Sequence, residues 1–177
     1  HFLINLNLLS GANDIRKELS THVEDSRFHV WQGPSPLAAE QQSNLANRKC
    51  ALDIQHQLLN KIKPDLYLLP SLFEGFIENA VVGIPDDHFT IPTVAVSYDF
   101  IPLLNPQEYL DGIPGYRKFY MNVVDHLKRA DHILTISESS KREAIECLNI
   151  PVDTITNIYA GVDSRFRPSA VLDDNVS

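Results

Sequence analysis

Asp99 lies two residues after a short apolar run, and its carboxylate could take part in binding or catalysis there. That run is Thr93–Ser97, and Tyr98 lies between it and the carboxylate. A carboxylate just beyond a buried strand can accept hydrogen bonds from the hydroxyl groups of a ligand. Asp is also a common turn former, and here it could open the Ile101-Pro102 loop as an Asx turn. The sequence leaves both interpretations of Asp99 open.

A second polar group follows the apolar run 133–136 and consists of Ser137, Glu138 and Ser139. Serine hydroxyls and the backbone amides of a helix N-terminus are suited to a phosphate or sugar oxygen. A helix is predicted over residues 139–148, with Ser140 and Glu143 at capping-box spacing. Plain helix capping is therefore the alternative role for these serines.

The elements that must position these groups alternate between strand and helix patterns. Apolar runs typical of strands occupy residues 2–9, 28–31, 65–69, 93–97, 133–136 and 154–159. Helical spacing of apolar residues predicts helices up to Leu19 and over 45–62, 116–130 and 139–148. This alternation predicts an α/β fold, a Rossmann-like parallel sheet flanked by helices. Ligands of such sheets bind beyond the carboxyl ends of the strands.

Composition and charge exclude several classes of protein. The 177 residues carry 15 Lys and Arg against 23 Asp and Glu, a formal charge of −8 that argues against a nucleic-acid binder. No apolar run approaches the roughly 18 residues that span a bilayer. The two cysteines, Cys50 and Cys147, suit buried thiols in a reducing compartment better than a disulfide framework. These features predict a cytoplasmic protein.

Familiar catalytic and metal-binding motifs are missing from the sequence. It contains no Gly-x-Gly-x-x-Gly, Walker A loop or Gly-x-Ser-x-Gly elbow, which disfavours a dinucleotide dehydrogenase or epimerase, a P-loop NTPase and an α/β-hydrolase. The histidines form no local ligand pair, so no metal site is predicted. Asp86-Asp87-His88 could hold a divalent ion, but its neighbouring glycine and prolines favour a turn.

Three segments in order resemble one protein family. Residues 94–103, Val-Ala-Val-Ser-Tyr-Asp-Phe-Ile-Pro-Leu, resemble the strand and following loop of group 1 glycosyltransferases with the GT-B fold. Residues 127–141 resemble the Ala-Asp-x-Ile-Leu-Thr-x-Ser-Glu-x-Ser-Lys segment of that family. Residues 155–168 resemble its Asn-x-x-x-Gly-Val-Asp segment. The resemblance covers residues 64–168.

The resemblance implies the N-terminal, acceptor-side domain of a retaining glycosyltransferase. Residues 1–168 would form this domain, and 169–177 would begin a linker to a C-terminal donor-binding domain that this chain lacks. The expected reaction moves a sugar, with mannose as one option, from a nucleotide sugar to a glycan or lipid-linked acceptor in cell-surface polysaccharide or lipopolysaccharide biosynthesis. No cofactor or metal is implied. The fragment alone would be inactive, and the complete protein could work at the inner face of the membrane.

The same resemblance assigns roles to individual residues. Asp99 would be the catalytic residue, while Tyr98 occupies a place where many members of the family carry His. Ser137, Glu138 and Ser139 would bind substrate.

Glu74 and Gly75 are the remaining expected substrate-binding residues. They lie in Pro70-Ser-Leu-Phe-Glu-Gly-Phe76, which mimics the donor motif of the C-terminal domain. The second Glu of that motif would fall at position 82, which is Val82 here. Because the flanking helix and strand and Tyr98-Asp99 place this segment in the N-terminal domain, Glu74 is interpreted as an acceptor-side loop residue, or alternatively as a carboxylate at a helix N-terminus.

A non-catalytic module is the competing interpretation. A Rossmann-like domain without a donor site could serve binding or regulation, and the loop 34–44 could dock a partner. A large exposed apolar face would instead indicate that a second domain normally covers this one.

Overall fold

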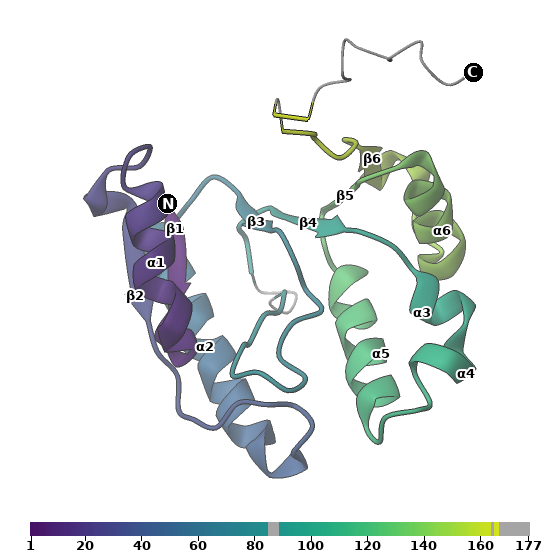
Figure 1. Cartoon of the computed structure of the whole chain (residues 1–177), viewed down its shortest axis with the longest axis horizontal. Helices are drawn as coiled ribbons and strands as arrows, with labels where there is room; N and C mark the ends of the chain where they lie inside the picture. The colour runs from purple at the N-terminus through teal and green to yellow at the C-terminus, as the bar shows by residue number, and fades with distance from the viewer. Residues whose placement is uncertain (85–88, 164, 167–177) are drawn as a thin grey trace, which may run out of the picture.

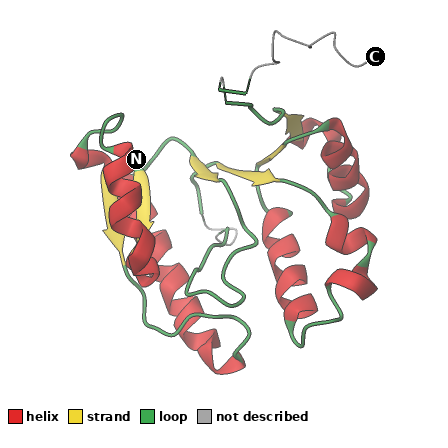
Figure 2. Ribbon diagram, viewed as in Figure 1, coloured by secondary structure: helices red, strands yellow, loops and turns green. Residues whose placement is uncertain are grey.

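The computed structural model describes residues 1–84, 89–163, 165 and 166 of the chain. Its helices and strands are drawn in Figure 1, and Figure 2 colours them by type. Asp86-Asp87-His88 and the expected linker 169–177 lie outside the described residues.

The described strands pair in parallel and divide between two sheets. β1 (Phe2–Asn5) pairs with β2 (Phe28–Trp31) in the smaller sheet. The larger sheet has the order β3-β4-β5-β6. Its strands are β3 (Tyr67–Leu69), β4 (Thr93–Ser97), β5 (His132–Thr135) and β6 (Ile155–Asn157). The predicted α/β class with a parallel sheet flanked by helices is confirmed.

Helices connect the successive strands except β3 and β4, between which the described residues form no helix. The longer ones are α1 (Leu9–Leu19), α2 (Leu45–Ile62), α5 (Tyr116–Leu127) and α6 (Glu138–Leu148). Two short helices, α3 (Ile101–Leu104) and α4 (Pro106–Tyr109), follow β4. Single 3-10 turns occupy Leu6–Leu8, Asp25–Arg27, Gln42–Asn44 and Val152–Thr154. Figure 1 places β1, β2, α1 and α2 on one side of the molecule, and α3 to α6 with the larger sheet on the other.

The main hydrophobic core lies between the larger sheet and helices α5 and α6. Its buried aromatic residues include Phe119 and Tyr120 of α5, and Tyr116 packs against them. The ring of Phe76 lies 4.9 Å from that of Tyr116 and 5.4 Å from that of Phe119, measured between centroids. This aromatic stripe is core packing. A smaller cluster joins Trp31, Leu37, Ala51 and Val81.

A long segment without helix or strand follows β3, and we call residues 70–84 the β3 loop. It carries buried apolar residues into both clusters, including Leu72, Phe76 and Ile84 in the larger one. The loop is therefore a packed part of the domain despite its irregular backbone.

Several local predictions differ from the structure. The run 2–9 is a strand only to Asn5, and α1 begins at Leu9 without a side-chain cap, ahead of the expected start near Asn13. Cys50 is exposed and Cys147 half-buried, and both thiols are free. The expected Ile101-Pro102 loop forms α3 and α4, because proline in the first turn of a helix costs no hydrogen bond.

Candidate functional site

Polar residues gather beyond the carboxyl ends of the larger sheet. Because β3, β4, β5 and β6 are parallel, the segments that follow them meet at one edge. The predicted site residues lie in three of these segments, after β3, β4 and β5. The structure thus places all of them at the edge where open α/β sheets bind ligands.

The segment after β4 is held against α6. The Ser140 hydroxyl donates to the Tyr98 carbonyl at 2.6 Å, and the Phe100 amide donates to Glu143 Oε2 at 3.3 Å. Phe100 is completely buried. These contacts fix the backbone on both sides of Asp99 and leave the Tyr98 side chain 54% exposed.

Asp99 forms the predicted Asx turn. Its Oδ1 accepts a hydrogen bond from the Ile101 amide at 3.1 Å, while the side chain stays exposed. Burial is the main cause that raises the pKa of Tyr120, and the Asp99 carboxylate adds to it. The turn accounts for one carboxylate oxygen and leaves the exposed carboxylate facing solvent. Its catalytic role stays a prediction.

Ser137 is the N-cap of α6. Its Oγ accepts from the Ser140 amide at 3.0 Å and lies 2.9 Å from the Ser140 hydroxyl. The predicted capping pair, Ser140 with Glu143, is therefore wrong by one turn. An extended backbone at Ser137 sets the cap there, and Glu143 instead accepts from the Phe100 amide.

Glu138 and Ser139 are exposed on the first turn of α6. Glu138 Oε1 accepts from the side-chain amide of Asn157 at 2.8 Å, and the Ser139 hydroxyl donates to Glu143 Oε1 at 3.1 Å. Capping and local pairing are thus observed for this group. Binding of a substrate by Ser137, Glu138 and Ser139 stays a prediction.

Glu74 and Gly75 lie in the β3 loop. The Ser71 hydroxyl donates to Glu74 Oε1 at 2.9 Å, and Glu74 is exposed. No helix begins within residues 70–80, so the alternative of a carboxylate at a helix N-terminus is wrong. Gly75 has φ +91°, which glycine adopts freely, and a Cβ here would lie 2.0 Å from the Ala80 carbonyl oxygen. Gly75 is therefore required by the backbone of the loop.

Arg48 of α2 holds the β3 loop and was not found from the sequence. Its Nη1 donates to the carbonyl oxygens of Leu37, Gly75 and Ala80 at 2.6, 2.9 and 3.2 Å. The guanidinium also lies over the Phe119 ring at 5.8 Å, and burial lowers its pKa. Its position on an amphipathic helix gave no signal, because arginine usually marks the solvent face.

The predicted site residues form three groups, after β4, after β5 and in the β3 loop. Hydrogen bonds join the first two. Tyr98 and Asp99 are linked to the start of α6 through Ser140 and Glu143. Among the hydrogen bonds and ion pairs of the described residues, none joins Glu74 to Asp99. The ring of the neighbouring Phe73 packs against that of Tyr120, with centroids 4.8 Å apart and ring planes tilted by 31°.

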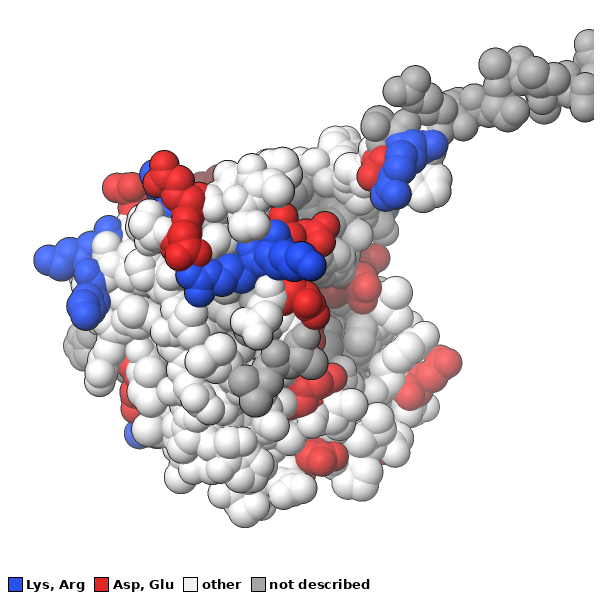
Figure 3. Space-filling view, turned by 60° about the vertical axis from the view of Figure 1, so that its left-hand side comes forward, with Lys and Arg blue, Asp and Glu red and all other residues white. Residues whose placement is uncertain are grey.

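Three further features are the surface charge, the grouping of possible metal ligands and the apolar length of the helices. Acidic and basic side chains lie interspersed on the face in Figure 3, beside a wide uncharged area. Within the described residues, no three His, Cys, Asp or Glu side chains are grouped as a metal site would need. No helix in that part of the chain is both long and apolar enough to cross a membrane.

Comparison with known proteins finds relatives that match this chain over a small part of their own length. Three proteins from Escherichia coli, each called serotype-specific mannosyltransferase WbdA, are 34% identical to this chain over 165 residues, or 93% of its length. The matched part is only 19–20% of each of those proteins. The chain thus spans about a fifth of the length of these relatives. No protein-family profile matches the chain, and no solved structure matches it significantly.

Proposed function

We propose that this chain is the acceptor-side domain of a retaining glycosyltransferase with the GT-B fold. The enzyme moves a hexose, with mannose the first choice, from a nucleoside-diphosphate sugar to a glycan or lipid-linked acceptor. Its product belongs to cell-surface polysaccharide or lipopolysaccharide. A donor-binding domain outside this chain completes the enzyme, which works in the cytoplasm at the inner face of the membrane and uses no metal.

The observation that carries this proposal is the similarity to the WbdA mannosyltransferases. An identity of 34% over 93% of the chain leaves only a few residues outside the match. The comparison therefore includes most of the strands and loops that hold the predicted site residues.

In this proposal the domain positions the acceptor hydroxyl and excludes water from the reacting groups. The Asp99 carboxylate accepts a hydrogen bond from an acceptor hydroxyl, and Tyr98 offers an exposed ring and hydroxyl beside it. The Ser139 hydroxyl and the α6 amides donate to sugar or phosphate oxygens, the Glu138 carboxylate accepts from a sugar hydroxyl, and Glu74 accepts from a second acceptor hydroxyl. Holding the acceptor hydroxyl next to the donor sugar lowers the barrier by several kcal/mol, about what well-oriented reactants gain.

The test is sugar transfer by the full-length protein that contains this chain. The protein is incubated with radiolabelled nucleoside-diphosphate hexoses, mannose among them, and an acceptor glycan, and incorporation is counted. Asp99→Asn should lower kcat/KM on the order of 100-fold, since a carboxylate that contacts the reacting hydroxyl contributes about that much. The Asn side chain still accepts the Ile101 amide, so the turn and the unfolding midpoint should persist.

Asp65→Asn is the matched control. Asp65 is an exposed carboxylate at the amino end of β3, the opposite edge of the sheet from Asp99. This variant should keep wild-type kinetics. Equal activity of Asp99→Asn and wild type would remove Asp99 from the mechanism, and absence of transfer with every donor would favour the non-catalytic binding module.

A further inference from the structure

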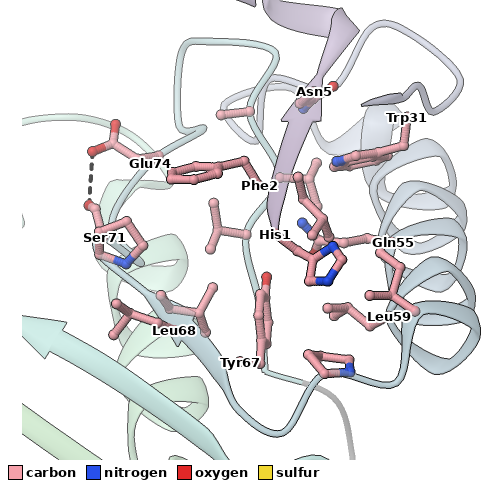
Figure 4. A pocket seen from close by; sticks show the side chains of 18 of the residues that line it. His1, Phe2, Asn5, Trp31, Gln55, Leu59, Tyr67, Leu68, Ser71 and Glu74 are labelled. Carbon is pink, nitrogen blue, oxygen red and sulfur yellow. Dashed lines mark hydrogen bonds between the residues drawn. The ribbon is translucent and has the colours of Figure 1, made fainter. Parts of the chain in front are cut away.

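A cavity of about 780 Å³ lies between the two sheets. β1 and β3 form facing walls, and α2 and residues 80–82 of the β3 loop close it. Figure 4 shows the side chains that point into this space. A volume in the range of about 300–1,000 Å³ is typical of a small-molecule site.

The walls of the cavity are mostly apolar. The lining residues include Phe2 of β1, Trp31 of β2, Leu59 of α2, Leu68 of β3 and Val81 of the β3 loop. Water gains little in such a space, because an ordered water needs two to four polar partners. The lining thus favours an apolar occupant.

One buried polar atom in the lining has no partner. Gln55 of α2 is only 6% exposed, and its Oε1 has no hydrogen-bond partner among the described residues. A buried amide oxygen without a partner destabilises the folded protein, because its hydrogen bond to water is lost and not replaced. A ligand that donates a hydrogen bond inside the cavity would remove this cost.

The opposite end of the cavity is polar and open. Figure 4 shows Ser71 and Glu74 at one end and Gln55 and Leu59 at the other, with Leu68 and Tyr67 between them. Ser71 and Glu74 are joined by a hydrogen bond of 2.9 Å, and Glu74 is exposed. The cavity therefore runs inward from Glu74, the residue that the family resemblance assigns to acceptor binding.

We propose that this cavity binds the apolar aglycone of the acceptor. The first sugar lies at Ser71 and Glu74, the apolar chain lies between β1 and β3, and a hydroxyl or amide hydrogen on that chain reaches Gln55 Oε1. The substrate class is an amphipathic glycoside, not a free oligosaccharide. This inference rests on the proposed function, and it adds a recognition element away from Asp99.

The experiment measures binding and transfer separately in the full-length protein. The probes are methyl mannoside, octyl mannoside, and ω-hydroxyalkyl mannosides from hexyl to decyl. Saturation-transfer NMR reports binding of each probe, and radiolabelled transfer reports KM. Octyl mannoside should bind at least about ten-fold more tightly than methyl mannoside, since each buried methylene contributes about 0.8 kcal/mol. The best ω-hydroxyalkyl mannoside should bind more tightly still.

Two variants locate the effect. Leu68→Trp fills the cavity from a half-exposed position on β3 and should abolish the advantage of the octyl chain, leaving methyl mannoside unchanged. Leu45→Trp makes the same change at an exposed position outside the cavity and should behave as wild type. Gln55→Leu should remove only the advantage of the ω-hydroxyl group.

The outcomes separate this inference from the proposed function. Chain-dependent binding that Leu68→Trp removes supports the cavity, even if no transfer is detected and the glycosyltransferase proposal fails. Transfer with equal KM for methyl and octyl mannoside would overturn the cavity and leave the function intact. Chain-dependent binding that survives in Leu68→Trp would also overturn it, because the alkyl chain would then lie elsewhere.

Discussion

The β5–α6 junction and the β3 loop are both segments at the carboxyl edge of one sheet, yet different forces hold them in place. At the junction, Ser137 caps an amide only three residues away. The β3 loop depends on Arg48, whose partner Gly75 lies 27 residues further along the chain. One segment is fixed by local bonds and the other by a distant side chain, so mutations should affect them very differently.

The β3 loop is also tied to the loop before α2. Ala39 and Glu40 donate their amides to the carbonyl oxygens of Gly75 and Phe76 at 3.0 and 2.9 Å. The Asn79 side chain accepts from the Leu37 amide at 2.7 Å. These two irregular segments therefore support each other, and a change in one should disturb the other.

Gly75→Ala should have the largest effect on stability. The new Cβ meets the Ala80 carbonyl at 2.0 Å in a backbone with φ +91°, so the loop must move. We expect a loss of about 4 kcal/mol or more in the free energy of unfolding, measured by urea denaturation. Gly115→Ala is the matched control: its φ is +81° but nothing lies within 4 Å of the added Cβ, so about 1–2 kcal/mol should be lost. Equal losses in the two variants would contradict the packed loop.

Arg48→Met should have the next largest effect. The variant keeps an unbranched apolar stem but leaves three carbonyl oxygens without their guanidinium donor. We expect a loss of about 2–3 kcal/mol, the range for hydrogen bonds from a charged donor. The exposed neighbour Lys49 provides the control, because Lys49→Met should change the unfolding midpoint little. Protease cleavage within residues 70–84 should accelerate only in Arg48→Met.

Ser137→Ala tests the locally fixed segment and should cost less. Removing an N-cap oxygen destabilises a helix by about 1 kcal/mol. Ser139→Ala, on the same turn but exposed, should cost under about 0.5 kcal/mol. Thermal unfolding of both variants against wild type measures the difference. If Ser139→Ala proves the more harmful change, the assignment of the cap to Ser137 is wrong.

The same contrast explains what could be predicted from the sequence. Residues 45–62 and 93–97 match α2 and β4 to the residue, because helical and strand periodicity are local properties of the chain. The positions of Tyr98 and Ser137 beyond the ends of strands followed from those elements. Their exact partners, such as Ser140 with the Tyr98 carbonyl, depend on contacts 42 residues apart and left no local signal.

The division into two sheets and the cavity between them could not be predicted either. Periodicity identifies strands but carries no information on which edges pair, so β1 with β2 and β3 with β4 emerged only from the structure. Gln55 lies four residues after Ala51 and four before Leu59, on the buried face of α2, where its polar side chain interrupts an otherwise apolar stripe. Its burial comes from the packing of α2 against the sheets.

The pH dependence of stability at the end of the β3 loop should be the smallest effect. His126 Nδ1 lies 3.1 Å from both the amide nitrogen and the carbonyl oxygen of Ile84, and 2.6 Å from Arg129 Nη2. Burial first, and then Arg129, lower the pKa of His126 in the folded protein. The unfolded chain therefore takes up its proton first, near pH 6.5, and the folded state loses stability as the pH falls from there towards the lower folded pKa. Wild type should lose stability relative to His126→Gln between pH 7.5 and 5.5 in urea denaturation, and the comparison cancels the groups that both proteins share. A constant difference across this range would show that the imidazole is protonated equally in both states.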